Sequence, residues 1–197
     1  MPPEKSLPWQ LGWRRAILGY DPVEVIAMPP EIRVIGVEGM PEVQEGDDLS
    51  GQMMDAADRQ GTPIEAGDML VVTQKVVSKT EGRVISLEGI EPSEMAIRIT
   101  EGHRRDPRHT EMILRESARI VRMDRGVIIS ETHHGFQCAN AGIDASNIPG
   151  SDTIALLPVD PDASARRVRD DVKNRLGVDV AVIISDTFGR PWRAAAV

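Results

Sequence analysis

Two short segments hold the side chains best suited to chemistry, and each follows a β-rich run. Residues 140–147 read Asn-Ala-Gly-Ile-Asp-Ala-Ser-Asn, and residues 184–193 read Ile-Ser-Asp-Thr-Phe-Gly-Arg-Pro-Trp-Arg. Each places an aspartate, Asp144 or Asp186, in a turn-forming context. Two carboxylates on separate loops can converge on one hard cation, and a cation beside hydroxyls and amides is common equipment for handling nucleotide phosphates. The two segments therefore suggest a cation-assisted phosphate site.

Both aspartates also have a purely structural explanation. From composition alone, an Asx or Ser turn joining two strands accounts for Asp144 better than a metal site does. Asp186 follows the most strand-like run of the chain, where a strand-end cap and a metal or nucleotide ligand explain it equally well. The hydroxyl of Thr187, directly after this carboxylate, could serve a second cation.

Several hydrogen-bond-donating side chains could contact phosphate oxygens. Gln74, Lys75 and Lys79 follow a predicted strand and precede a glycine turn, and donors on flexible stems suit phosphates. Taken alone, a solvated basic face explains them better. Arg190 and Arg193 could hold an anionic substrate or stack on the tryptophan between them.

The remaining reactive residue types give weaker signals. His133 and His134 are adjacent, and neighbours on a strand point to opposite faces, so at most one is expected to face a site. Cys138 is interpreted as a small buried hydrophobe. The sequence contains no P-loop, His-Glu-x-x-His, Gly-x-Ser-x-Gly or Cys-x-x-Cys pattern, which excludes the common NTPase, zinc-protease and serine-hydrolase classes.

Charge and composition narrow the class of protein further. A net charge of −8 argues against a nucleic-acid or anionic-membrane surface, although one anionic nucleotide can still be bound locally. A single cysteine in 197 residues rules out an internal disulfide and suits a reducing cytoplasm. No apolar run approaches the roughly 20 residues of a membrane-spanning helix, and the N-terminus lacks the apolar core of a signal peptide.

The elements that must position these residues can be predicted from caps and periodicity. Helices are expected after the cap Asp47-Asp48, from Pro92 to about Glu101, from Asp106-Pro107 past Leu114, and from Pro161 to Leu176. Strands are expected at 32–37, 69–72, 83–87, 120–123, 126–130, 136–140, 153–157 and 179–184, with a turn at 79–82.

Helices and strands are mixed without strict alternation, and 120–130 reads as a hairpin. We therefore predict an α+β fold with mixed and antiparallel sheets and flanking helices. Residues 1–30 differ in composition and are interpreted as an N-terminal extension, either docked on a neighbour through 10–17 or poorly ordered. Residues 31–197 form the predicted domain.

Read together, these segments resemble the coenzyme F420-0:L-glutamate ligase family, also called F420 γ-glutamyl ligases. Any one motif is weak, but the ordered set is specific and covers roughly residues 32–193. The matching segments are 37–43, 45–49, 67–79, 132–144, 157–158, 160–165 and 184–193.

This resemblance implies a GTP-dependent amide ligase. The family adds L-glutamate to the deazaflavin precursor F420-0, and then further glutamates through γ-linkages, by way of an acyl phosphate. Two divalent ions, magnesium or manganese, are implied, with potassium assisting, and the family pairs its subunits, which predicts a homodimer. Phosphoryl transfer needs mainly positioning and charge neutralisation, so oxygen ligands and lysines suffice.

The resemblance also assigns roles to individual residues, although it leaves the catalytic residue open. Asp144 and Asp186 match ligands of the first metal, and Thr187 matches a ligand of the second. Positions that match the nucleotide site are Met40, Pro41, Glu42, Val43, Gln74, Lys75, Lys79 and Asn147.

Two departures from the family leave alternatives open. The family's chain continues beyond the segment at 184–193 with a part that completes the second metal site, so this sequence is expected to hold the N-terminal portion of the catalytic domain. A non-catalytic nucleotide- or deazaflavin-binding homologue is then an alternative to the ligase, and so is a ligase for another acidic acceptor. The family suggests no role for residues 1–30.

Overall fold

The computed structural model describes residues 31–187 except 104, 125 and 146–151. The described residues fall into two units, which divide between residues 36 and 37. The expected extension at 1–30 lies outside the described residues. The expected strand at 32–37 is wrong, because residues 31–43 contain neither helix nor strand. Ile32 and Val34 are each 91% exposed, and the structure pairs no strand with this stretch, so its apolar pattern has no sheet to join.

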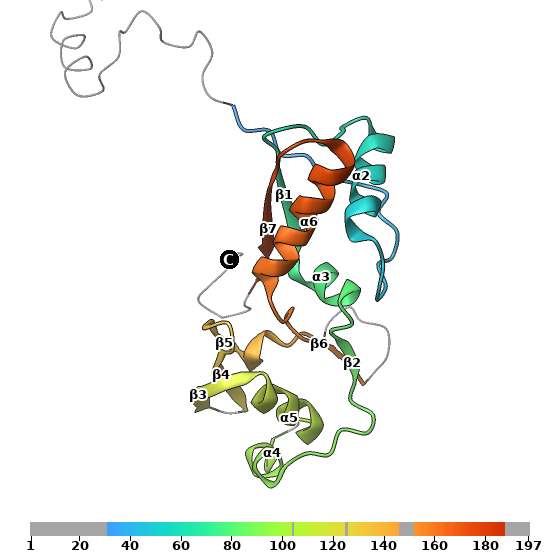
Figure 1. Cartoon of the computed structure of the whole chain (residues 1–197). Helices are drawn as coiled ribbons and strands as arrows, with labels where there is room; N and C mark the ends of the chain where they lie inside the picture. The colour runs from blue at the N-terminus through green and yellow to red at the C-terminus, as the bar shows by residue number, and fades with distance from the viewer. Residues whose placement is uncertain (1–30, 104, 125, 146–151, 188–197) are drawn as a thin grey trace, which may run out of the picture. The chain divides into compact units, whose positions relative to one another are not determined.

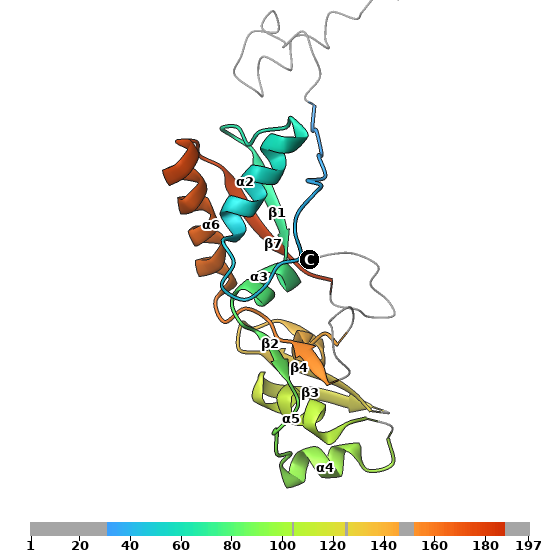
Figure 2. The ribbon, with the colours of Figure 1, turned by 90° about the vertical axis from the view of Figure 1, so that its right-hand side faces the viewer.

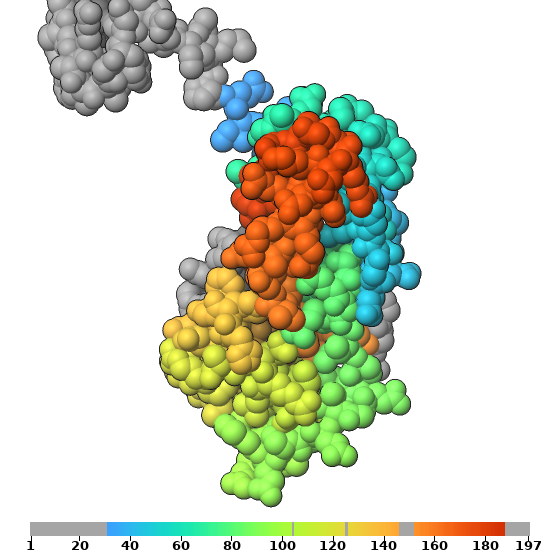
Figure 3. Space-filling view, viewed as in Figure 1, coloured from blue at the N-terminus to red at the C-terminus, as the bar shows by residue number. Residues whose placement is uncertain are grey.

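The second unit is built partly around a parallel pair of strands, β1 (Met69–Thr73) and β7 (Ala181–Ser185). They run in register from Met69 opposite Ala181 to Thr73 opposite Ser185. The helices α2 (Leu49–Gln60) and α6 (Pro161–Leu176) lie on one side of this pair (Figures 1 and 2). One core beneath them contains Met54, Leu70, Val172, Val180 and Val182. In Figure 3, the side chains of α6 form the outer surface of this face.

Local capping explains where the long helices start and stop. The Asp48 carboxylate accepts a hydrogen bond from the Gly51 N–H at the start of α2, and the Asp160 carboxylate accepts one from the Ala163 N–H at the start of α6. Pro161 occupies the first turn of α6, and Gly177 ends this helix with a left-handed backbone. These predicted boundaries are confirmed.

A second group of elements packs around a separate core. Its members are β2 (Val84–Ser86), α4 (Glu94–Thr100), α5 (Pro107–Arg115), β3 (Ser117–Asp124), β4 (Val127–Thr132), β5 (Gln137–Ala139), the 3-10 turn η2 (Asn140–Gly142) and β6 (Thr153–Ala155). β2 pairs with β6, and β3, β4 and β5 form a sheet in that order, all antiparallel. Fully buried residues of this core include Ile113, Ile128, Ile154 and Leu156.

A short helix, α3 (Gln74–Thr80), follows β1 directly. The sequence predicted a strand end and a turn here, so helix formation is a difference. The buried polar residues Gln74 and Ser78 lie one turn apart, and Gln74 Nε2 and Ser78 Oγ donate to the same carbonyl, Leu156 O, at 3.1 and 2.6 Å. A helical turn satisfies both side chains at once, which explains the local structure.

The combination of a parallel pair, antiparallel sheets and packed helices confirms the predicted α+β class. The hairpin of β3 and β4, the strand β1 and the last strand β7 fall where the sequence predicted them, within a few residues. Among the described residues, no helix is both long and apolar enough to cross a membrane.

Candidate functional site

Asp144 is presented by an unusual turn that is fixed to β6. Asn140 and Ala141 both have φ of 55°, and Gly142 has φ of 71°, so three successive residues adopt the left-handed region. The chain then reaches Asp144, whose N–H donates to Ala155 O at 3.0 Å and whose carbonyl accepts from Ala155 N at 2.8 Å. Backbone strain of this kind clusters at functional sites, and here it places a carboxylate beside a strand.

Asp186 immediately follows β7 and is partly buried. Its Oδ1 accepts a hydrogen bond from the Thr187 N–H at 2.7 Å. Burial raises the pKa of the Asp186 carboxyl, and the negative charge of Asp144 raises it further. The Thr187 N–H and the positive charge of Lys75 act in the opposite direction on that pKa. The structure thus brings the two predicted metal-binding aspartates within electrostatic reach of each other.

Lys75 joins this group from α3. Its Nζ lies 2.6 Å from Asp144 Oδ2, and the two side chains are 25% and 38% exposed. The carboxylate of Asp144 therefore has a close cationic partner inside the protein. No pattern in the sequence indicated that these two residues meet.

A short path of backbone and side-chain contacts connects the two aspartates. Asp186 follows Ser185, which pairs with Thr73 at the end of β1. Gln74, which follows Thr73, donates a hydrogen bond to Leu156 O. Ala155, which precedes Leu156 in the chain, pairs with Asp144. The start of α3 therefore lies between the supports of the two carboxylates.

The other predicted nucleotide-contacting residues lie toward the second turn of α3. Lys79 forms an ion pair with Glu42, and Val43 is buried. Met40 packs against a small core of Leu49, Val72 and Val77. Pro41 is exposed.

The segment around these residues is held on its other side by α2. Arg59 Nη2 donates to Gly39 O at 3.2 Å, and the Glu38 N–H donates to Gln60 Oε1 at 2.7 Å. The predicted residues therefore flank one helix, α3, although their nucleotide roles stay predictions. Asn147 lies outside the described residues, and so do Arg190 and Arg193.

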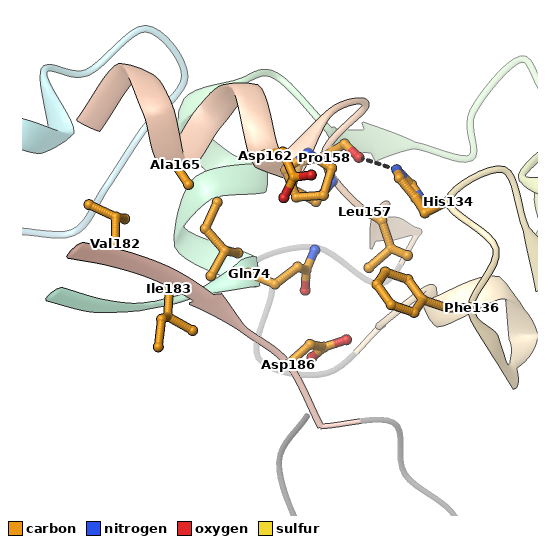
Figure 4. Close-up of a pocket in the computed structure, with 12 residues that line it drawn as sticks. Gln74, His134, Phe136, Leu157, Pro158, Asp162, Ala165, Val182, Ile183 and Asp186 are labelled. Carbon is orange, nitrogen blue, oxygen red and sulfur yellow. Dashed lines mark hydrogen bonds between the residues drawn. The ribbon is translucent and has the colours of Figure 1, made fainter. Parts of the chain in front are cut away.

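A cavity of about 330 Å³ adjoins Asp186 and was not predicted from the sequence (Figure 4). Its walls are mainly apolar, and the side chains of Gln74, Phe136 and Asp186 face the same space. The residues that line it are Gln74, His134, Phe136, Leu157, Pro158, Pro161, Asp162, Ala165, Val182, Ile183, Ile184 and Asp186.

The histidine pair divides as the sequence suggested. His134 lines the cavity and stacks on Phe136, with ring centroids 6.2 Å apart. Its Nε2 lies 2.8 Å from Pro158 O (Figure 4). The same Nε2 lies 3.1 Å from Val159 O. A carbonyl only accepts hydrogen bonds, so Nε2 carries the proton. The Nε2 of His133 instead contacts Arg115 O at 3.0 Å, and Cys138 is fully buried as expected.

The donor set suits a hard divalent ion better than a soft one. Within the described ranges, no three His, Cys, Asp or Glu side chains gather in a way that could hold a metal, so a closed zinc site has no ligands there. Magnesium is commonly held by one or two carboxylates, with water and substrate phosphates completing its shell. Asp144 and Asp186, which lie within electrostatic reach of each other, fit that pattern. Their metal-binding role stays a prediction.

Comparisons with known proteins show which family of sequences the chain resembles. The model of the family "F420-0:Gamma-glutamyl ligase" matches residues 39–197. The "Coenzyme F420:L-glutamate ligase" of Methanothermobacter thermautotrophicus is 48% identical over 167 residues, 84% of this chain and 66% of that protein. Proteins with the same name from Methanopyrus kandleri and Methanocaldococcus jannaschii are 45% and 40% identical, each over 85% of this chain and 64% of the relative.

The chain thus spans just under two thirds of the length of these curated relatives. The matched range contains Asp144, Asp186 and the whole of α3. On the extent of the family match and the identity to these relatives, the chain belongs to the F420-0:gamma-glutamyl ligase family.

Proposed function

We propose that this chain takes part in the GTP-dependent addition of L-glutamate to coenzyme F420-0, followed by the addition of further γ-linked glutamates. The observation that carries the proposal is the group formed by Lys75, Asp144 and Asp186. It places two carboxylates and an ammonium together, beside a helix that presents Lys79 one turn further on. The names of the relatives, which are ligases of L-glutamate to coenzyme F420, support the same reaction.

The proposed chemistry has two steps. An oxygen of the acceptor carboxylate attacks the γ-phosphorus of GTP, and the bond from that phosphorus to GDP breaks, which leaves an acyl phosphate. The glutamate amine then attacks the acyl carbon, phosphate departs with the electrons of the C–O bond, and the nitrogen loses a proton. The products are an amide, GDP and phosphate. Most of the catalysis in such transfers is positioning and charge neutralisation.

The side chains of α3 would bind and orient the phosphates. Lys75 and Lys79 lie four residues apart, so they project from the same side of the helix and can reach neighbouring phosphate groups. We propose that Asp144 and Asp186 hold one magnesium or manganese ion and that Thr187 contributes to a second, with potassium as a further cofactor. When bound, the divalent ions would neutralise charge on the transferring phosphoryl group.

We assign the cavity beside Asp186 to the acceptor. A reacting carboxylate must arrive close to the metal-binding aspartates, and this cavity opens there. Its apolar walls and the stacked His134 and Phe136 rings suit a flat heteroaromatic ring such as a deazaflavin.

We also propose a homodimer. Met69, Val71 and Ile183 lie on the face of the β1–β7 pair opposite the helices and are 59%, 62% and 44% exposed. Parallel sheets are normally covered on both faces, so a second subunit could cover this one. Light scattering coupled to size-exclusion chromatography tests the proposal, and a stable monomer at high protein concentration would contradict it.

The central test is mass spectrometry of the full chain incubated with F420-0, L-glutamate, GTP and Mn²⁺. A product heavier by one or more glutamyl units, formed only with GTP, is expected. Asp144→Asn and Asp186→Asn should abolish that product while circular dichroism shows the fold intact. The matched control is Asp179→Asn, which changes an exposed aspartate paired with Lys173 and Arg169 and should keep full activity.

Two results would count against parts of the proposal. Full activity in either Asp144→Asn or Asp186→Asn would refute the metal assignment. Binding of GTP and F420-0 by the wild-type chain without any turnover would favour a non-catalytic binding protein instead.

A further inference from the structure

Lys75 Nζ occupies a position beside Asp144 that a divalent ion bound to this carboxylate would also need. Its Nζ is 2.6 Å from Asp144 Oδ2, the distance of a strong charge-assisted hydrogen bond. In the described part of the chain, Lys75 is also the cation whose charge reaches Asp186. One ammonium group therefore interacts with both carboxylates that are proposed to hold a metal.

A divalent ion and this ammonium group compete for Asp144. An ion bound to the carboxylate would lie close to Nζ, and the two positive charges would repel each other. The pair is only partly exposed, so solvent screens this repulsion less than at an open surface. Binding of the ion therefore favours the departure of Lys75 from Asp144.

The proposed nucleotide phosphates give Lys75 an alternative partner. The lysine stem has four carbons and can swing without movement of the backbone. Lys79 lies one turn further along α3, and the two lysines together flank the place proposed for the nucleotide phosphates. A phosphate at this position offers Lys75 a replacement for the anion that it gives up.

We infer that Lys75 serves as an exchangeable counter-ion, which blocks the divalent ion at Asp144 until a nucleotide phosphate draws the ammonium away. This inference rests on the proposed function, because it needs both a divalent ion and a nucleotide at the site. The affinity of each ligand should then increase in the presence of the other, and by thermodynamic linkage the two increases are equal. A metal ion should therefore be held weakly when no nucleotide is bound.

The test measures each ligand alone on the full chain. Free Mn²⁺ is followed by electron paramagnetic resonance in the absence of nucleotide, and GDP binding is followed by calorimetry in the absence of metal. Lys75→Met should bind Mn²⁺ alone about tenfold more tightly than the wild type, and GDP alone about tenfold more weakly. These opposite shifts in one variant are the signature of an exchanged counter-ion.

Three further variants serve as controls. Lys75→Gln removes the charge while it keeps a hydrogen-bond donor for Asp144. It should shift both affinities in the same directions as Lys75→Met, and it replaces that variant if Lys75→Met folds poorly. Lys75→Arg keeps the charge and should retain the weak Mn²⁺ affinity of the wild type. Lys79→Met removes an equal charge from the same helix, where its partner is Glu42, and should weaken GDP binding but leave Mn²⁺ affinity within about twofold.

The outcomes separate this inference from the proposed function. If wild-type chain makes the glutamylated product but Lys75→Met and Lys75→Gln bind Mn²⁺ no more tightly than wild type, the counter-ion inference alone is wrong. If Lys79→Met strengthens Mn²⁺ binding as much as Lys75→Met, the effect is general electrostatics and the inference is also wrong. If the wild type and every variant fail to bind both Mn²⁺ and GDP, the proposed function and the inference fall together.

Discussion

Replacing Gly142 with alanine should destabilise the protein at the turn that presents Asp144. Gly142 has φ of 71°, in the left-handed region, where an alanine costs about 1 kcal/mol more than glycine. A Cβ built on Gly142 would also lie 2.9 Å from Leu157 Cδ1 and 3.0 Å from Leu157 Cγ. Leu157 is buried, and its side chain also lines the cavity of about 330 Å³, so part of the close contact can be relieved if this side chain shifts into the cavity.

The two costs add to a measurable loss of stability. Overpacking typically costs about 1–3 kcal/mol, and the free space beside Leu157 favours the lower end of this range, so the free energy of unfolding should fall by about 2 kcal/mol in total. For a domain of this size, that corresponds to a fall in melting temperature of about 4–8 °C. Urea unfolding followed by circular dichroism measures the free energy directly.

Gly177 provides a matched control at the end of α6. Its φ is 74°, almost the same as that of Gly142, but a Cβ there would meet no atom within 4 Å. Gly177→Ala should therefore cost only the backbone term of about 1 kcal/mol. In a Leu157→Ala background, the cost of Gly142→Ala should fall toward the same value, because the three nearest atoms all belong to Leu157.

The reasoning fails if Gly142→Ala and Gly177→Ala destabilise the protein equally. It also fails if the Leu157→Ala background leaves the cost of Gly142→Ala unchanged. Either result would mean that the left-handed backbone alone accounts for glycine at residue 142, and that close packing on Leu157 does not.

Two further predictions concern acid stability and the acceptor. Hydrogen bonds from the Ser93 hydroxyl and N–H, together with one from Arg115, lower the pKa of Glu111 from 4.5 to about 2. Between these two pH values the unfolded chain therefore binds more protons than the folded chain. The stability that this carboxylate contributes above pH 4.5 should be lost as the pH falls toward 2. Glu111→Gln should lack this acid-dependent component in urea unfolding from pH 6 to about 2. Phe136→Ala should raise the KM for F420-0 about tenfold with no change in the KM for GTP. The control Val159→Ala, at an exposed residue outside the cavity lining, should change neither KM. An equal rise in both KM values for Phe136→Ala would contradict the assignment of the cavity to the acceptor.

Elements governed by local interactions could be predicted from the sequence. The starts of α2, α5 and α6 depend on an aspartate cap, with proline in the first turn of α5 and α6, and these signals lie within a few neighbouring residues. The α+β class followed from the mixed order of helices and strands. These features needed no knowledge of which distant segments meet.

Elements governed by distant contacts were predicted less well. Residues 32–37 have the composition of a strand but no pairing partner in the described structure, and the sequence alone cannot show that absence. Helix α3 forms where two buried polar side chains share the carbonyl of Leu156, a residue far away in the sequence. Neither the missing pairing partner nor the shared carbonyl can be predicted from local propensity.

The candidate site divides in the same way. The residue types at Asp144 and Asp186 were visible in the sequence, and the family resemblance assigned them a role. Their approach to each other depends on pairing of β1 with β7 and of Asp144 with Ala155. The contact of Lys75 with Asp144 and the cavity at Phe136 both follow from that tertiary arrangement. No sequence pattern therefore predicted them.

The hydrogen bonds from Gln74 and Ser78 to one carbonyl have a consequence for sequence variation within the family. Asp186 is supported by the strand pair beneath α2 and α6, and Asp144 is supported by the core around Ile154 and Leu156. Each core can exchange apolar residues of similar volume and keep its own aspartate in place. The spacing between the aspartates is instead set where α3 meets the backbone of Leu156. In homologous chains the apolar residues of both cores should therefore vary, whereas residues 74 and 78 should remain polar and small enough to share that carbonyl.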